Sequence, residues 1–254
     1  MNSAIYETSP ALAQYLILHY GPAEWQLPSS APSPELAHFP VRCVQEGFRW
    51  EELPPHPTAL ELGCAVGRAC FELSRRCRRV VGLDRSQTFL QSARLLQERG
   101  SIRCPVPLEG DQSVEWEFSL PAGVCPDRIE FRVGDALSTP FEESFDLVLA
   151  ANLLDRVPDP RALLDRLPAL LHPGGQLLLT SPFSWLSEHT PRERWLLPGS
   201  QQVASLLLPH FTLLRKWDLP LVLREHPRKF QWCLPEATLW RKKPPSFLPN
   251  RENA

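Results

Sequence analysis

The chain has 254 residues, of which 43% are hydrophobic and 22% are charged. These proportions are typical of a globular protein and exclude a disordered or fibrous chain. The length suits one large hydrophobic core, so we expect a single domain over residues 1–254. The net charge of −2 at pH 7 gives no reason to expect nucleic acid as a partner.

The sequence shows no membrane or export signal. No apolar run approaches the ~18 residues of a transmembrane helix, and the N-terminus lacks the charged start and apolar stretch of a signal peptide. The seven cysteines include no C-x-x-C pair and no histidine at zinc-finger spacing. We therefore expect free thiols, no bound metal, no membrane partner and a cytoplasmic location.

The charge is unevenly distributed along the chain. Residues 1–184 carry a net charge of −7, whereas residues 185–254 carry +5. A basic C-terminal part could contact nucleic acid. A solvated edge strand protected by charged side chains explains so few residues better, and we favour it.

Residues 1–57 predict an N-terminal helical extension. Ser9 is expected to cap a helix in which Pro10 takes the first position and Gly21 follows the last turn. After a proline-rich linker, Pro40 is expected to begin a second short helix. Neither helix has a core of its own, so both are expected to pack over the main domain as a lid.

From residue 58 onward, short apolar runs alternate with amphipathic stretches, a pattern typical of β-α units around a parallel sheet. Residues 58–182 are therefore expected to form the core of the domain. The expected strands are residues 58–62, 79–83, 129–133, 145–150 and 176–180. The expected helices are residues 68–76, 86–99 and 160–171. Residues 101–126 interrupt the alternation and are expected to form an inserted hairpin.

Residues 183–254 begin with a long loop rich in tryptophan and proline. Two strand-like runs follow, at residues 210–218 and 230–240. They could form the antiparallel edge that many mostly parallel sheets carry. The sequence thus predicts an α/β fold, a doubly wound and mostly parallel sheet with an antiparallel C-terminal edge strand.

The sharpest local feature is a strand that runs into a glycine turn and then a helix. In Glu61-Leu-Gly-Cys-Ala-Val-Gly67, Gly63 allows a tight turn and Gly67 is expected to let the backbone approach a ligand. The following helix presents unpaired N–H groups. The pattern indicates a nucleotide site, but it differs from the G-x-G-x-x-G dinucleotide fingerprint.

Polar side chains also follow the next strands. Asp84 ends the second strand 21 residues after Gly63, where doubly wound folds place the carboxylate that accepts both ribose hydroxyls. Asp135 and Asn152 end the third and fourth strands. An aspartate after a strand is usually a helix cap. Together, these residues predict a ligand site at the carboxyl edge of the sheet.

These residues resemble the class I S-adenosylmethionine-dependent methyltransferases over residues 58–182. The resemblance implies a Rossmann-like fold with S-adenosylmethionine as the cofactor. It places Asp84 at the ribose and Asp135 and Ala136 beside the adenine, while Ala65 stands where many members have a glycine. The cofactor-binding residues implied are Glu61, Gly63, Cys64, Ala65, Gly67, Asp84, Arg85, Ser86, Asp135, Ala136 and Asn152.

A closer resemblance, over almost the whole chain, is to the methyltransferases of ovothiol biosynthesis. It rests on segments beginning at Glu7, Glu61, Ala151, Thr180 and Arg224, of which the last, R-E-H-P-R-K-F-Q-W, is the most specific. The resemblance implies methylation of an imidazole nitrogen of 5-thiohistidine, and not the sulfur-insertion step. A separate sulfoxide synthase is accordingly a candidate partner.

Methyl transfer requires the nucleophile, the methyl group and the sulfur to be held in line. A neutral imidazole needs no strong base, so the protein must instead fix its tautomer. Asn152 is the first candidate, followed by Tyr20 and Asp155, although Asp155 could simply cap the next helix. The candidate substrate-binding residues are Tyr15, Tyr20, Trp185, Glu188, His189, Arg224, Glu225 and Lys229.

Each substrate candidate has a simpler interpretation. Tryptophans such as Trp185 more often pack in a core. Arg224 and Lys229 could bind an amino-acid carboxylate, or they could belong to an exposed ionic edge strand. We favour the site because the closer resemblance includes Arg224 and Lys229.

Two other functions remain open at this point. A nucleic-acid or protein methyltransferase is suggested by the basic C-terminal part, but no long basic stripe supports it. A companion that binds the cofactor without catalysis is the second alternative, and product analysis would separate it from an enzyme.

Overall fold

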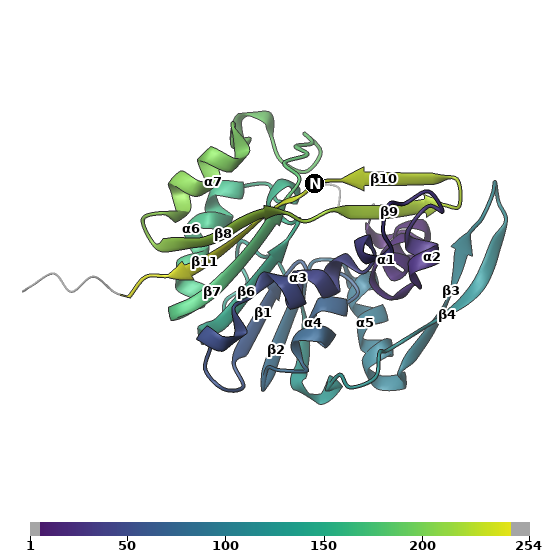
Figure 1. Ribbon diagram of the computed structural model, residues 1–254, viewed down its shortest axis with the longest axis horizontal. Helices are drawn as coiled ribbons and strands as arrows, with labels where there is room; N and C mark the ends of the chain where they lie inside the picture. The colour runs from purple at the N-terminus through teal and green to yellow at the C-terminus, as the bar shows by residue number, and fades with distance from the viewer. Residues whose placement is uncertain (1–5, 245–254) are drawn as a thin grey trace, which may run out of the picture.

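The computed structural model describes residues 6–244. Its centre is a seven-stranded sheet in the order β5-β2-β1-β6-β7-β11-β8, in which β1, β2, β5, β6 and β7 pair in parallel (Figure 1). The strands of this sheet are β1 (Thr58–Leu62), β2 (Arg79–Asp84), β5 (Ile129–Val133), β6 (Phe145–Ala151), β7 (Leu171–Ser181), β8 (Phe211–Asp218) and β11 (Glu236–Lys242). The predicted fold class is confirmed.

Helices cover both faces of the sheet. Strand β1 is buried along its whole length, as expected for a parallel strand between two helical layers. Helices α3, α4 and α5 lie on one face, and α6 and α7 lie on the other (Figure 1). The helices are α1 (Ser9–Tyr20), α2 (Ala23–Gln26), α3 (Phe39–Gly47), α4 (Arg68–Leu73), α5 (Gln87–Arg99), α6 (Pro160–Leu170) and α7 (Gly199–Leu207).

The antiparallel strand of the sheet is β11. It lies between β7 and the outermost strand β8 and pairs antiparallel with both. Proline is one reason why the C-terminal part forms more strands than expected. The run at residues 230–240 is not one strand, because Pro235 lies between β10 (Lys229–Cys233) and β11 and has no N–H to donate to a sheet.

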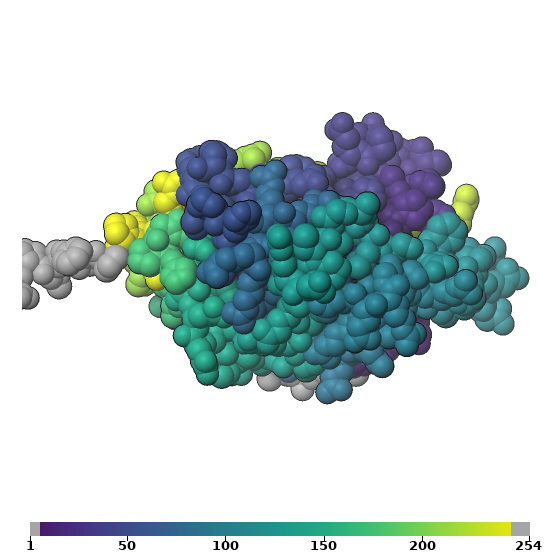
Figure 2. Space-filling view, turned by 90° about the horizontal axis from the view of Figure 1, so that it is seen from below, coloured from purple at the N-terminus to yellow at the C-terminus, as the bar shows by residue number. Residues whose placement is uncertain are grey.

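Two hairpins lie outside the main sheet. The predicted insertion forms β3 (Ser101–Pro107) and β4 (Ser113–Ser119), which pair antiparallel. A second hairpin consists of β9 (Leu221–His226) and β10. Helix α1 contacts β3, β4 and β9. Figure 2 shows the N-terminal helices and the β3–β4 hairpin gathered at the same end of the molecule.

Two helix predictions need correction. Thr8, not Ser9, is the N-cap of α1, and its side chain accepts from the Ala11 N–H at 3.4 Å. The loop after Ser181 contains helix α7, which was not predicted. Its inward face rests on Val203 and Leu207, four residues apart. Within residues 6–244, no helix is long and apolar enough to span a membrane.

Candidate active site

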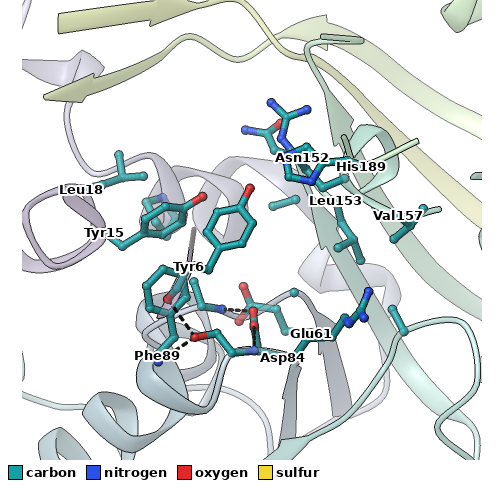
Figure 3. A pocket seen from close by; sticks show the side chains of 18 of the residues that line it. Tyr6, Tyr15, Leu18, Glu61, Asp84, Phe89, Asn152, Leu153, Val157 and His189 are labelled. Carbon is teal, nitrogen blue, oxygen red and sulfur yellow. Dashed lines mark hydrogen bonds between the residues drawn. The ribbon is translucent and has the colours of Figure 1, made fainter. Parts of the chain in front are cut away.

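A cavity of about 420 Å³ lies at the carboxyl ends of β1, β2 and β6, beneath α1 and the residues that precede it. Most of the predicted cofactor residues line it. Figure 3 shows Glu61 and Asp84 at one end of this space and Asn152 and His189 at the other. The predicted residues that line the cavity are Glu61, Gly63, Ala65, Asp84, Arg85, Ser86, Asp135, Ala136 and Asn152 for the cofactor, with Tyr15, Glu188 and His189 for the substrate.

The glycine turn has a different construction from the predicted one. Gly63 and Gly67 both have left-handed backbones, with φ of 75° and 83°. Gly67 does not face the cavity: a Cβ there would lie 2.7 Å from the Phe131 ring. Its role is therefore close packing against Phe131. Cys64 is fully buried behind the turn, because its side chain fills the core rather than the cavity.

Asp84 ties the end of β2 to this turn. One carboxylate oxygen accepts from the Ala65 N–H and the other from the Ser86 N–H, both at 2.8 Å. Burial raises the pKa of Asp84, while these N–H donors lower it. Each oxygen keeps a second lone pair for a ligand. Asp84 thus fits the predicted contact to two hydroxyls.

Glu61 is the second buried acid of the cavity. Burial raises the pKa of its carboxyl to about 8, although a hydrogen bond from the Cys70 thiol at 2.9 Å opposes the shift. Neither Glu61 nor Asp84 forms an ion pair with any residue in the range 6–244. Unpaired buried carboxyls next to a cavity fit a cationic ligand with hydroxyl groups, as S-adenosylmethionine is.

Helix α1 holds the glycine turn from above. The Tyr20 hydroxyl donates to the Val66 carbonyl at 2.7 Å, and the Arg68 N–H donates to Nδ1 of His19 at 3.4 Å. Burial lowers the pKa of His19 to about 3, so this ring is neutral and able to accept. Tyr20 was predicted to be catalytic. Its hydroxyl is instead directed to the turn, and the residue does not line the cavity.

Asn152 begins the opposite wall of the cavity. Its φ of 51° is one that asparagine tolerates better than most residues. Its side-chain oxygen accepts from the Thr180 hydroxyl at 2.8 Å, while its own N–H donates to the Thr180 carbonyl at 2.9 Å. The amide NH₂ remains available to a ligand. The first catalytic candidate therefore lies in the cavity.

Asp155 does not line the cavity. Its side chain is fully buried, and its Oδ2 accepts from Arg156 at 2.9 Å. Burial raises the pKa of this carboxyl, and the Arg156 charge lowers it. Asp155 therefore acts on the site through Arg156, which does line the cavity.

Tyr6, Phe89 and Arg156 line the cavity but were not among the predicted site residues. Tyr15 and Phe89 have ring centroids 4.7 Å apart, and Tyr6 stacks on His189 at 6.1 Å with an interplanar angle of 23°. A signal was available, since Tyr6 directly precedes the Glu7 segment and Arg156 ends the Ala151 segment of the closer resemblance.

Besides Tyr20, four substrate candidates lie outside the cavity, namely Trp185, Arg224, Glu225 and Lys229. Arg224 is buried against α2, where it donates to the Trp25 carbonyl at 3.1 Å and lies 4.8 Å from the Trp25 ring centroid. Lys229 is exposed and pairs with Glu225 at 2.7 Å. Trp185 packs against the apolar cluster of the α6–α7 face. The predicted carboxylate contact of Arg224 and Lys229 is therefore not supported by their position.

Among residues 6–244, no three or more histidine, cysteine, aspartate or glutamate side chains form a group that could hold a metal ion.

A family model described as a methyltransferase domain matches residues 60–179. A ubiquinone biosynthesis O-methyltransferase of Bradyrhizobium sp. (strain ORS 278) is 27% identical over 175 residues, which are 65% of this chain and 58% of that protein. The norajmaline N-methyltransferase of Rauvolfia serpentina is 22% identical over 147 residues, 56% of this chain and 43% of that protein. The chain spans about half the length of the curated relatives that it matches.

Solved structures agree in fold. The N-methyltransferase NodS from Bradyrhizobium japonicum WM9, in complex with S-adenosyl-L-homocysteine, has a TM-score of 0.55 and 19% identity, over 93% of this chain and 98% of that one. The [4+2]-cyclase SpnF has a TM-score of 0.59 and 16% identity, over 94% and 95%. Residues 60–179 thus match a methyltransferase domain, the solved structures share the fold, and the strand-end acids fit S-adenosylmethionine as the cofactor.

Proposed function

We propose that this methyltransferase transfers the methyl group to an imidazole nitrogen of 5-thiohistidine, as the last step of ovothiol biosynthesis. The support from the sequence is the resemblance of several segments to that family. One of these segments begins at Glu7, next to Tyr6, and another ends at Arg156. A separate sulfoxide synthase would then supply the thiohistidine. Each of these statements goes further than the family match, which concerns methyl transfer in general.

The observation that carries the proposal is the chemistry of the cavity wall opposite Glu61 and Asp84. The rings of Tyr6, Tyr15 and Phe89 offer flat apolar surfaces, and His189 offers ring nitrogens. Burial and the nearby Arg156 lower the pKa of His189, so its ring is neutral at pH 7. A small aromatic ring with hydrogen-bonding nitrogens suits such a wall.

The cover over the cavity also favours a small acceptor. The cavity is bounded by Tyr6 and Tyr15 on one side and by Gln231 and Cys233 of the β9–β10 hairpin on the other. Its volume of about 420 Å³ is in the usual range for small-molecule sites. A nucleic-acid or protein acceptor would need a more open approach.

The reaction requires little acid–base chemistry from the protein. Bound S-adenosylmethionine supplies an electrophilic methyl group on a sulfonium. The lone pair of the unprotonated imidazole nitrogen forms the new N–C bond while the S–C bond breaks. The electron pair of the S–C bond stays on the sulfur. The thiolate of the acceptor offsets the positive charge that the ring gains. Burial raises the pKa of Tyr15, so that hydroxyl stays protonated and serves as a donor.

Asn152 is placed to orient the acceptor ring. Because its side-chain oxygen is held by Thr180, the amide presents a donor. The second lone pair of that oxygen can accept from the protonated ring nitrogen, which fixes the tautomer and leaves the lone pair of the other nitrogen free to attack the methyl group. The alignment of nitrogen and methyl group then supplies most of the rate.

A second candidate is O-methylation of a small hydroxylated aromatic compound. It is favoured by the ubiquinone biosynthesis O-methyltransferases among the relatives. A phenol must lose its proton during transfer, so this reaction would need a base. Neutral His189 is the residue in the cavity that could accept that proton.

Product analysis by mass separates these functions. The protein is incubated with S-adenosylmethionine and, separately, 5-thiohistidine, histidine, a dihydroxybenzoate and RNA. We expect methylated 5-thiohistidine, with histidine tenfold to hundredfold slower, since a site for the thiolate leaves donors unpaired when the sulfur is missing. Faster methylation of the dihydroxybenzoate or RNA would overturn the substrate, and no product from any acceptor would favour the non-catalytic companion.

A further inference from the structure

Arg156 is the cation on the acceptor wall of the cavity, and it keeps N–H donors for an anionic ligand although it is paired with Asp155. Among the described residues that line the cavity, the arginine and lysine side chains are Arg85 and Arg156. Arg85 lies 3.9 Å from Asp135, beside the residues predicted for the adenine. Arg156 follows β6 and Asn152, on the wall of the predicted acceptor. An anionic group of the acceptor would therefore meet Arg156.

The guanidinium of Arg156 is held from one side. Its NH1 donates to the Asp155 carbonyl, to Oδ2 of Asp155 and to the Ser184 carbonyl, each at 2.9 Å. Because Asp155 is fully buried, this anchor is rigid. Within residues 6–244, Nε and NH2 of Arg156 donate no hydrogen bond of good geometry. This edge carries three further N–H donors.

The Tyr6 hydroxyl lies beside the same guanidinium. Burial raises the pKa of Tyr6 and the charge of Arg156 opposes this rise, while the Tyr6 ring stacks on that of His189. Besides burial, the charge of Arg156 acts on the pKa of His189 and of Cys233, in both cases to lower it. The cation is thus surrounded by side chains that line the cavity, namely Tyr6, His189 and Cys233.

The geometry points to Arg156, assisted by the Tyr6 hydroxyl, as the clamp for the α-carboxylate of an amino-acid acceptor. This assignment rests on the proposed function, because it names how an amino acid is recognised at that site. The planar Nε–NH2 edge matches a carboxylate in two parallel hydrogen bonds, and Tyr6 adds a third donor. Asp155 is the positioning residue that fixes the guanidinium.

A carboxylate is a better occupant than the thiolate of 5-thiohistidine. Two oxygens can accept from Nε and NH2 together, whereas a single sulfur cannot take both directions. The arrangement also leaves the ring free to lie against Tyr6 and Tyr15 while its protonated nitrogen faces Asn152. The same side chain would then bind histidine as well as 5-thiohistidine, since both carry the carboxylate.

Binding measurements on the full chain saturated with S-adenosyl-L-homocysteine test the clamp. The ligands are 5-thiohistidine, its decarboxylated analogue 5-thiohistamine, and histidine. The variants are Arg156→Gln, Arg156→Lys and, as a matched control, Arg194→Gln, which breaks an exposed ion pair with Asp159 outside the cavity.

We expect the wild type to bind 5-thiohistidine roughly 10- to 100-fold more tightly than 5-thiohistamine, as hydrogen bonds to a charged group require. Arg156→Gln should remove this preference, because the affinities for 5-thiohistidine and histidine should fall by the same factor while the affinity for 5-thiohistamine stays unchanged. Arg156→Lys should retain part of it, because the charge remains without the planar fork. Arg194→Gln should behave as the wild type does.

Four results would overturn the clamp. The first is equal wild-type affinity for 5-thiohistidine and 5-thiohistamine, and the second is an equal loss of affinity for both ligands in Arg156→Gln. The third is a loss of affinity for 5-thiohistidine without one for histidine. The fourth is weaker S-adenosyl-L-homocysteine binding in Arg156→Gln. The last would assign Arg156 to the carboxylate of the cofactor.

Binding and methylation measured together distinguish a failure of the clamp from a failure of the proposed function. If the wild type shows the carboxylate preference but does not methylate 5-thiohistidine, the clamp stands and the substrate is wrong. If it methylates 5-thiohistidine without that preference, the substrate stands and the clamp is wrong. Absence of binding by all three ligands would overturn both.

Discussion

Raising the pH from 6 to 8 is expected to strengthen S-adenosylmethionine binding about 50-fold, because it ionises Glu61. In the free protein, burial raises the pKa of this carboxyl to about 8. The cofactor carries a sulfonium and an ammonium, which favour the ionised carboxylate. Binding near pH 7 must therefore remove a proton from Glu61, and this requirement weakens the affinity as the pH falls.

The magnitude follows from the ionised fraction. With a pKa of about 8, about 1% of the free carboxyl is ionised at pH 6 and about 50% at pH 8. A cation at ~4 Å in an effective dielectric of ~20 contributes ~4 kcal/mol, or about three pKa units. In the complex, Glu61 then stays ionised down to about pH 5. The change in affinity between pH 6 and 8 is the ratio of the two fractions.

The stability of the free protein depends on pH in the opposite direction to cofactor binding. The pKa of Glu61 in the folded protein lies above the 4.5 that is usual for a free glutamate carboxyl. Its contribution to stability is therefore fully present below about pH 4.5 and is lost as the pH rises through about 8. Glu61→Gln should remove this loss in the free protein, as thermal unfolding at pH 5, 7 and 8 would measure.

Calorimetric titration with S-adenosylmethionine at pH 6, 7 and 8 measures the affinities. Repeating the pH 7 titration in two buffers of different ionisation enthalpy counts the released proton, expected to be close to one. Glu61→Gln is the matched control, because it keeps the shape and cannot ionise. An equal pH dependence in the two proteins would refute the role of Glu61.

Three substitutions test other parts of the site and its surroundings. Asp84→Ala should weaken S-adenosylmethionine binding by ~1.5–3 kcal/mol in calorimetry, since the charged carboxylate oxygens would no longer accept hydrogen bonds from the cofactor; unchanged affinity in a folded variant would contradict this role. Ala65→Gly should raise the free energy of unfolding in urea by ~0.5–1 kcal/mol, because Ala65 has a φ of 47°, which costs a non-glycine residue ~1–2 kcal/mol; a lower stability would argue against strain there. Arg224→Met should leave acceptor and cofactor affinities unchanged while lowering the free energy of unfolding by ~1–2 kcal/mol, through loss of its contacts with Trp25; a selective loss of acceptor affinity would return Arg224 to the substrate site.

The sheet could be predicted from the sequence because its central strands are buried on both sides. Buried parallel strands read as short apolar runs, and β1, which is buried throughout, begins and ends at the predicted residues. The C-terminal part was harder. Helix α7 has only two buried residues, Val203 and Leu207, and its first turn is polar. Such a weak apolar stripe does not stand out from a loop.

The cofactor side of the cavity was also accessible to sequence reasoning. Strand ends of a parallel sheet meet at one edge, so Asp84, Asp135 and Asn152 could be brought together by order alone. Cys64 and Gly67 show the limit of this reasoning. They belong to the same turn, yet their direction depends on core neighbours such as Phe131 that the local pattern does not specify.

The acceptor side depends on tertiary packing, which explains why Arg224 was predicted at the site although it lies outside the cavity. Arg224 lies in a charged and specific segment, but the β9–β10 hairpin packs against α2 and buries its guanidinium on Trp25. Arg156 looks like an ordinary residue after a strand. It reaches the cavity because buried Asp155 fixes its NH1 and because Tyr6, 150 positions earlier in the chain, packs beside it. Charge density in the sequence therefore identified a hairpin that borders the cavity, whereas the place of each arginine in or outside the cavity lining is decided by packing between distant parts of the chain.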